Sequence, residues 1–252
     1  MVVMNFSGAY NLESFDKDPE IIRMDFRELS GTDGYCSREA AKVIKEQIQP
    51  FGPHGIHFLD SGDYHYVSKF WTDMITEPFS LVLIDHHTDM QDSRVDGMLS
   101  CGDWVKAVIL QNRFLKHVFV LGCPKESALK VDGSLLDKVT FVSEQQFKDS
   151  LSGKLEPAGG ETIYISIDKD ALSPADAVTN WDQGEMREAD LRRFLYHQVE
   201  REKVLGVDVC GEYQVVSDYF ADALPAKIDS AANQDILMTI IAAVQKKKQQ
   251  DR

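Results

Sequence analysis

The sequence has few cysteines, and their placement excludes several kinds of small, cross-linked protein. The four cysteines, Cys36, Cys101, Cys123 and Cys210, are far apart in the 252 residues and form no C-x-x-C pair. This spacing excludes a disulfide framework and a zinc ribbon. It is typical of reduced thiols in a cytoplasmic protein, because disulfides are rare in that compartment.

Long hydrophobic runs are also absent. No stretch of about 18 apolar residues occurs, so we expect no segment to span a membrane. The first residues, Met1–Phe6, have no basic segment followed by a long apolar one, which excludes a signal peptide. We therefore predict a cytoplasmic protein.

Positive charge is scarce as well. The chain has 27 Lys and Arg residues against 41 Asp and Glu residues, which gives a formal net charge of −14. Nucleic acids and anionic membranes are bound by clustered basic residues, so we expect neither as a partner. The question is whether some of the excess acidic residues form a site.

The sequence does contain a regular alternation of short apolar runs and longer amphipathic stretches. The apolar runs predict strands at residues 21–26, 56–59, 80–84, 117–121, 139–142, 162–167 and 204–209. The amphipathic stretches predict helices at residues 37–49, 67–75, 103–111, 188–200 and 230–247. Such alternation indicates a three-layer α/β fold with a mostly parallel sheet. We find no linker and predict a single domain over residues 1–252.

Metal-binding residue types follow one of the predicted strands. Asp85, His87 and Asp89 come directly after the strand at 80–84, and alternate residues of an extended chain point the same way. Ligands of open parallel sheets bind beyond the carboxyl ends of the strands. Carboxylates together with imidazole suit manganese, iron or zinc. The segment therefore predicts metal ligands, with a polar loop as the alternative.

Two further loops could add ligands to the same edge of the sheet. Asp168 and Asp170 follow the strand at 162–167. At a strand end, a D-x-D is as often a mere helix cap or solvated turn as it is a pair of metal ligands. His65 follows the strand at 56–59 and would, alone, be more typical of a structural histidine. Since all three loops follow strands of one predicted sheet, we expect a single site with six candidate ligands: His65, Asp85, His87, Asp89, Asp168 and Asp170.

The charge of this cluster predicts two metal ions. Four aspartates within a few ångströms would repel one another and take up protons unless cations neutralised them. Two divalent cations would balance the four carboxylates. A pair of metal ions can also activate a water molecule as hydroxide at neutral pH.

The combination resembles the ureohydrolase superfamily of arginases, agmatinases and formiminoglutamases. That family has D-A-H-x-D after one strand and S-x-D-x-D-x-x-D-P after a later one. Here the segments are D-H-H-T-D at 85–89 and S-I-D-K-D-A-L-S-P at 166–174. Their order agrees, and the similarity covers the chain from about residue 20 to residue 245.

The resemblance implies an arginase-like fold and a binuclear manganese centre, with zinc or iron as alternatives. One metal ion would have four ligands: His65, Asp85, Asp89 and Asp168. The other would also have four: His87, Asp85, Asp168 and Asp170. A metal-bridging hydroxide would hydrolyse a linear C–N bond of a guanidino or amidino compound. Glu212 would hold the cationic group of this small substrate, and homo-oligomers are common in the family.

The chain departs from the family pattern at three points. The family's first ligand lies in G-G-D-H-S, whereas S-G-D-Y-H at 61–65 has an extra residue before the histidine, so Asp63 is an alternative ligand. Cys101 stands near the position of arginase's proton-shuttling histidine and is a candidate nucleophile, soft ligand or packed thiol. Asp103 or water would then supply the proton for the leaving amine. Glu212 is itself displaced by one residue.

Two other functions stay open on the sequence alone. The segment V-L-I-D-H-H at 82–87 also matches the DHH phosphoesterases, but that family has its D-x-D motif before the D-H-H, not after it. The second is a metal-binding ureohydrolase-like protein without activity, which the missing shuttle histidine supports. A single-zinc, deacetylase-type site is a lesser variant, because six candidate ligands exceed its needs.

Overall fold

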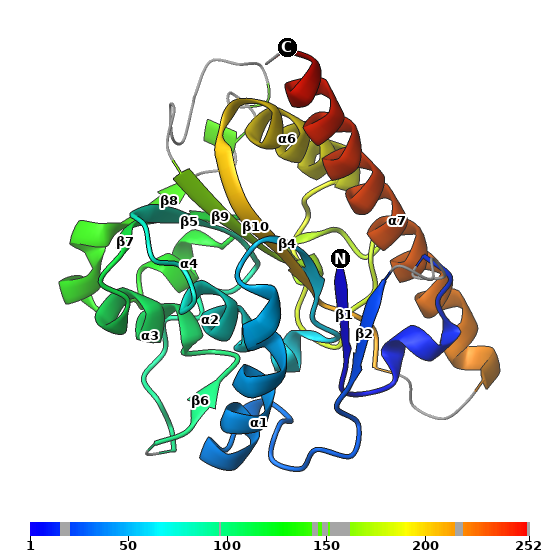
Figure 1. Cartoon of the computed structure of the whole chain (residues 1–252), viewed down its shortest axis with the longest axis horizontal. Helices are drawn as coiled ribbons and strands as arrows, with labels where there is room; N and C mark the ends of the chain where they lie inside the picture. The colour runs from blue at the N-terminus through cyan, green and yellow to red at the C-terminus, as the bar shows by residue number, and fades with distance from the viewer. Residues whose placement is uncertain are drawn as a thin grey trace.

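An eight-stranded sheet forms the centre of the molecule (Figure 1). The computed structural model describes residues 1–15, 21–95, 97–142, 146–147, 151, 162–214 and 219–250. The strands are β1 (Val2–Asn5), β2 (Ile22–Asp25), β4 (Gly55–Phe58), β5 (Phe79–Ile84), β7 (Leu115–Leu121), β8 (Val139–Val142), β9 (Thr162–Asp168) and β10 (Lys203–Cys210). Their order is β2-β1-β4-β10-β9-β5-β7-β8, and every neighbouring pair is parallel.

Helices cover both faces of this sheet (Figure 1). The helices are α1 (Arg38–Ile48), α2 (Val67–Thr72), α3 (Trp104–Gln111), α4 (Lys125–Ala128), α6 (Glu188–Arg201) and α7 (Tyr219–Gln250). Residues of α1, α2 and α3 share one hydrophobic core with Leu81 and Leu83 of β5. Residues of α6 and α7 share the other core with Val82 and Ile84. Strand β5 is thus buried along its whole length and apolar except for Ser80, because both of its faces are covered.

The predicted three-layer α/β fold with a parallel sheet is confirmed, although several short elements were not predicted and one helix begins earlier than expected. Strand β1 was not predicted, because four residues are too few for periodicity to separate a strand from other structure. Helix α7 begins at Tyr219 and contains Pro225, whereas the expected start was residue 230. A proline disfavours helical backbone at the residue before it, so it is ordinarily taken as a helix boundary.

The strand order fixes the place of the site. Strands β4, β10, β9 and β5 are neighbours and run in the same direction, so the loops that follow them lie side by side at one edge. A small antiparallel pair, β3 (Tyr35–Cys36) with β6 (Leu99–Ser100), lies outside the main sheet. In the described part of the chain, no helix is both long enough and apolar enough to cross a membrane.

Candidate metal centre

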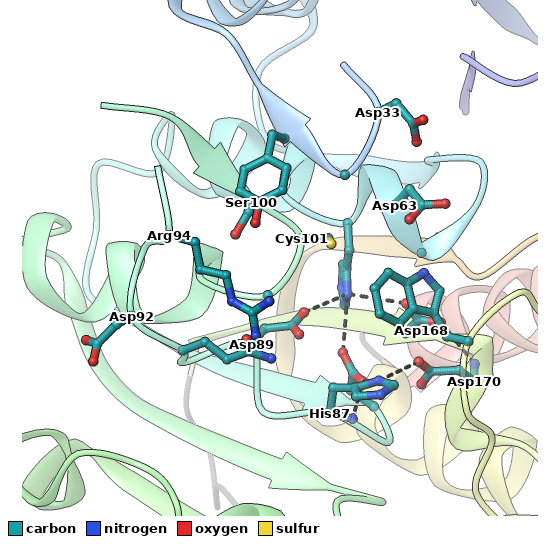
Figure 2. A pocket seen from close by; sticks show the side chains of 18 residues that line it. Asp33, Asp63, His87, Asp89, Asp92, Arg94, Ser100, Cys101, Asp168 and Asp170 are labelled. Carbon is teal, nitrogen blue, oxygen red and sulfur yellow. Dashed lines mark hydrogen bonds and ion pairs between the residues drawn. The ribbon is translucent and has the colours of Figure 1, made fainter. Parts of the chain in front are cut away.

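The loops after β4, β5 and β9 line one pocket of about 310 Å³. Figure 2 shows Asp89, His87, Asp168 and Asp170 directed toward its interior from different segments. All six predicted ligands line this pocket: His65, Asp85, His87, Asp89, Asp168 and Asp170. His86, between two of them, is not among the lining residues.

His65 occupies the buried side of the cluster. Its Nδ1 atom lies 3.2 Å from Asp85 Oδ2 and 3.1 Å from Asp89 Oδ2. Asp168 Oδ2 lies 3.5 Å from the same nitrogen. The side chain is only 1% exposed, and Nδ1 makes no hydrogen bond. One ring nitrogen among three carboxylate oxygens is the arrangement that a shared metal ion satisfies.

The other ring nitrogen of His65 is fixed by a hydroxyl group. Nε2 lies 2.9 Å from Ser166 Oγ, in the strand that ends at Asp168. When Nε2 donates its proton to this oxygen, Nδ1 has a lone pair that faces the carboxylates. Metal-binding histidines are held in this way by a partner on the nitrogen that does not bind the metal.

Asp85 joins the two halves of the cluster. Its Oδ2 atom faces His65, and its Oδ1 atom lies 3.6 Å from His87 Nδ1. Asp85 Oδ2 is buried and accepts no hydrogen bond. His87 Nδ1 lies 2.7 Å from Asp170 Oδ2, which completes the second half. A carboxylate with one oxygen toward each histidine can bridge two cations.

The electrostatics of the site favour cations. Burial raises the pKa of Asp168 to about 7, with the charges of Asp170 and Asp85 acting in the same direction. Burial and the charge of Asp85 likewise raise the pKa of Asp170 to about 7. Burial lowers the pKa of His87, but its hydrogen bond to Asp170 and the nearby carboxylates outweigh this and raise it to about 11. These raised pKa values show that the cluster favours bound protons and, by the same electrostatics, bound cations.

Asp89 is held in a conformation that few side chains adopt. Its φ is 51°, in the left-handed region, which costs roughly 1 kcal/mol outside glycine. The indole Nε1 of Trp104 donates to Asp89 Oδ2 at 2.7 Å. The backbone N–H of Val105 donates to the Asp89 carbonyl oxygen at 3.0 Å. The start of α3 therefore fixes this carboxylate toward His65, and such strain is common at functional sites.

The donor set fits divalent metal ions. In the described residues, three groups of side chains bring their possible ligand atoms within 4.8 Å of one another: His65–Asp85–Asp89, Asp85–His87–Asp170 and His65–Asp168–Cys210. The first two groups share Asp85, and the first and third share His65. Imidazole and carboxylate donors in this number suit manganese, iron or zinc.

The comparisons with known proteins bear on the fold. No family-level sequence profile matches the chain. An uncharacterized protein of Thermotoga maritima is 32% identical over 158 residues, which span 63% of this chain and 58% of that protein. The chain thus aligns with little more than half the length of its curated relative.

Solved structures give a closer correspondence in shape. The agmatine ureohydrolase of Thermoplasma volcanium superposes with a TM-score of 0.68 and 15% identity over 99% of this chain and 91% of its own. The arginase of Entamoeba histolytica, in complex with L-ornithine, gives 0.65 and 10% over 95% and 97%. A Mn²⁺-containing formiminoglutamase variant of Trypanosoma cruzi gives 0.68 and 10% over 94% and 92%. The chain has the ureohydrolase fold.

The loop after β4 directs a histidine toward the carboxylates. His65 ends a short 3₁₀ turn, Gly62–Tyr64, that takes up the extra residue. Asp63 lies on the pocket wall instead, where its Oδ2 atom accepts from Asn180 Nδ2 at 2.7 Å and Gln214 Nε2 at 2.8 Å. The geometry favours His65 over Asp63 as the ligand.

Glu212 lies away from the pocket. It is fully buried and is not among the residues that line the pocket. Its Oε2 atom accepts from Lys169 Nζ at 2.5 Å, and its Oε1 atom accepts from Asn233 Nδ2 at 2.9 Å. The predicted role of Glu212 in holding a guanidinium group does not fit, because its carboxylate already neutralises a buried lysine.

Position 211, the glycine directly before Glu212, cannot carry an acidic side chain that would hold a guanidinium group. Its φ is 90°, and a Cβ atom added there would lie 2.4 Å from Asp168 Oδ1. Only glycine allows the backbone to pass so close to this carboxylate. After β10 the chain therefore presents no glutamate to the pocket, although the family resemblance implied one there.

The two other predicted catalytic residues have different positions. Cys101 lines the pocket, but burial raises the pKa of its thiol, with nearby aspartates adding to the effect. This direction favours a packed thiol over a nucleophile in the metal-free site, since the thiolate is the reactive form. Asp103 is buried outside this pocket and accepts from the Ser100 N–H at 2.7 Å. It closes the turn before α3, so the role of proton source does not fit.

The pocket wall contains residues that sequence reasoning did not assign to it. Arg94 is the one lysine or arginine among the described lining residues, and Trp181 packs edge-on against His87 with ring centroids 5.7 Å apart. Both lie in irregular loops, where spacing carries no information about the site. Lys169, between the two aspartates of the D-x-D motif, lies outside the pocket wall and is buried against Glu212, which its place in the sequence did not indicate.

Proposed function

We propose that this chain is a divergent ureohydrolase. It would be a binuclear metal-dependent hydrolase that cleaves a linear C–N bond of a small guanidino or amidino compound. The observation that carries the proposal is the placement of Asp85, which presents one oxygen to His65 and the other to His87. Asp85 Oδ1 also accepts from the His87 N–H at 2.6 Å, but Oδ2 is buried without a hydrogen bond. Bound cations would offset the desolvation cost of this carboxylate oxygen.

The chain's own residues would hold and orient these cations. His65, Asp85, Asp89 and Asp168 form the buried half, and His87 with Asp170 forms the half nearer the opening, where the His87 side chain is 30% exposed. When bound, the metal ions lower the pKa of water and so supply a nucleophile at neutral pH. Manganese is the metal that the family resemblance favours.

The pocket wall supports a cationic substrate. Asp33, Asp63 and Asp92 line the opening in addition to the four aspartates of the cluster. Two divalent cations would neutralise the cluster and leave the wall acidic, which attracts an amidinium or guanidinium group. The exposed indole of Trp181 offers a ring face for such a planar cation. Since Glu212 is engaged by Lys169, we propose Asp63 as the carboxylate that orients the cationic group.

Arg94 supports a second feature of the substrate. It is exposed at the pocket wall and forms no ion pair with another of the described residues. A free guanidinium at the entrance suits a carboxylate at the far end of the substrate. An amidino or guanidino acid would therefore fit the pocket better than a simple diamine derivative. The four cysteines are unpaired, which fits the proposed cytoplasmic location.

A substrate panel tests the proposal. The purified chain is loaded with Mn²⁺ and incubated with agmatine, arginine, formiminoglutamate and other guanidino or amidino acids, while urea, ammonia and formamide are measured. We expect metal-dependent turnover of at least one compound and its loss in Asp85→Asn. Hydrolysis of a generic phosphodiester with no turnover of the panel would favour the phosphoesterase alternative. No turnover of either class by metal-loaded protein would favour the inactive, metal-binding alternative.

A further inference from the structure

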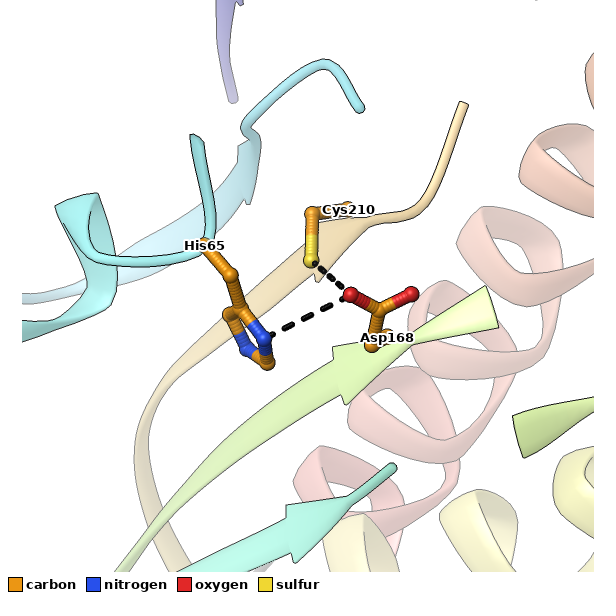
Figure 3. Close-up of side chains that lie close together, drawn as sticks. All are labelled: His65, Asp168 and Cys210. Carbon is orange, nitrogen blue, oxygen red and sulfur yellow. Dashed lines mark hydrogen bonds and ion pairs between the residues drawn. The ribbon is translucent and has the colours of Figure 1, made fainter. Parts of the chain in front are cut away.

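A buried sulfur atom lies against the metal cluster on the side of His65. Cys210 is the last residue of β10 and is fully buried. Its Sγ atom lies 3.2 Å from Asp168 Oδ2, the same oxygen that lies 3.5 Å from His65 Nδ1. Figure 3 shows the His65 ring and the Cys210 sulfur both directed toward this oxygen. The three side chains bring their possible ligand atoms within 4.8 Å of one another.

The fold brings this sulfur to the site by strand register. Cys210 and Asp168 are register partners on the neighbouring parallel strands β10 and β9. Side chains at paired positions leave a sheet on the same side, so the thiol and the carboxylate face the same space. Gly211, with its φ of 90°, then turns the chain away without a side chain that would separate them.

A second observation points to a ligand at the same place. His65 Nδ1 is buried and has no hydrogen-bond partner, although it is surrounded by carboxylate oxygens. Its other nitrogen is engaged by Ser166, so the free one cannot be satisfied by a change of ring orientation. An electron-pair acceptor among His65, Asp168 and Cys210 would satisfy the nitrogen and take the thiol sulfur as a donor.

We propose that Cys210 is a ligand of the metal ion on the His65 side, which makes this half of the centre a mixed nitrogen, oxygen and sulfur site. The proposal rests on the metal centre of the proposed function but not on its substrate. On binding, the sulfur–hydrogen bond breaks, the proton leaves to solvent and the sulfur electron pair goes to the metal. Thiolate ligands favour zinc or iron(II), while carboxylate sites suit manganese. The His65 half therefore selects zinc or iron(II), and the half with His87 and Asp170 accepts manganese.

Cobalt(II) is a direct probe of the sulfur. Protein stripped of metal is titrated with Co²⁺ alone, and its near-ultraviolet absorption is recorded. A cobalt–thiolate bond gives a charge-transfer band that nitrogen and oxygen ligands do not give. We expect this band in the wild-type chain, its loss in Cys210→Ser and Cys210→Ala, and its retention in Cys101→Ser and Cys123→Ser. Circular dichroism and the number of Co²⁺ ions bound show whether each variant is folded and still loads metal.

Metal competition gives the second readout. The ratio of Zn²⁺ to Mn²⁺ affinity should fall roughly tenfold or more in Cys210→Ser, because the soft ligand is lost while the harder ones stay. Binding of Co²⁺ to the wild-type chain without the charge-transfer band would overturn the role of Cys210. It would still support a metal centre with nitrogen and oxygen ligands. Loss of the band in Cys101→Ser and not in the Cys210 variants would show that Cys101, and not Cys210, is the sulfur ligand. A band without hydrolysis of any amidine would keep this inference and contradict the proposed function.

Discussion

Replacing Glu212 with glutamine separates a structural role from a catalytic one. Glu212 Oε2 lies 2.5 Å from Lys169 Nζ, and both side chains are 0% exposed. The family resemblance implied that this glutamate holds the cationic group of the substrate. In the structure it lies outside the pocket and contacts Lys169, between Asp168 and Asp170. The structural role predicts that the substitution lowers Tm, whereas the catalytic role predicts that it lowers kcat/KM and leaves Tm unchanged.

The size of the effect follows from the burial of the pair. Breaking a buried ion pair by removing one partner costs about 3–5 kcal/mol, since the other charge is left without compensation. Asp229 Oδ1 lies 3.7 Å from the same lysine nitrogen and would offset part of this loss. We therefore expect a destabilisation of about 3 kcal/mol in Glu212→Gln, which corresponds to a fall in Tm of roughly 6–12 °C for a chain of this size.

The assay combines thermal or urea unfolding with kcat/KM per folded, metal-loaded molecule. Lys203 and Glu77 provide a matched control, because their charged atoms also lie 2.5 Å apart but their side chains are 60% and 43% exposed. Glu77→Gln should cost less than about 1 kcal/mol. An unchanged Tm in Glu212→Gln, together with a loss of kcat/KM greater than about tenfold, would refute the structural role.

Three other changes should have measurable effects. Trp104→Phe removes the indole N–H that donates to Asp89 and should weaken metal affinity by roughly tenfold or more in a competition titration; an unchanged affinity would show that this hydrogen bond does not orient the ligand. Chelation of the metal should lower Tm by several degrees, since ligand at 100 times its Kd adds about 2.7 kcal/mol, and an unaltered melting curve would contradict tight binding. Asp63→Asn should raise KM for a cationic substrate about fivefold with little change in kcat, and a fall in kcat alone would place Asp63 elsewhere in the reaction.

Much of the fold could be predicted because its signals are local. The strand at Phe79–Ile84 is apolar except for Ser80, since helices cover both of its faces, and that pattern is visible in six residues. The four residues of β1 carry no such pattern, and their place between β2 and β4 depends on pairing with distant strands. Local sequence cannot specify that pairing.

The site divides in the same way. The residue types of Asp85, His87 and Asp89 after a strand indicated candidate ligands, but the expected convergence of all three by strand alternation is wrong. Residues 85–89 form a loop in which Asp89 has a φ of 51°, and His87 and Asp89 belong to different groups. The burial of Glu212 could not be predicted, since it depends on Lys169 and on Asn233 of α7, 21 residues further along the chain. Cys210 was likewise without a signal, because only the register of β10 against β9 brings it beside Asp168.

Metal content is the most direct test of the central claim that this pocket is a binuclear metal centre. The chain is purified without chelators, and bound transition metals are counted by elemental mass spectrometry, before and after incubation with Mn²⁺ and Zn²⁺. We expect about two divalent ions per chain in the loaded wild type, and fewer in Asp85→Asn because the bridge between the halves is lost. Absence of bound transition metal before and after incubation would contradict the claim.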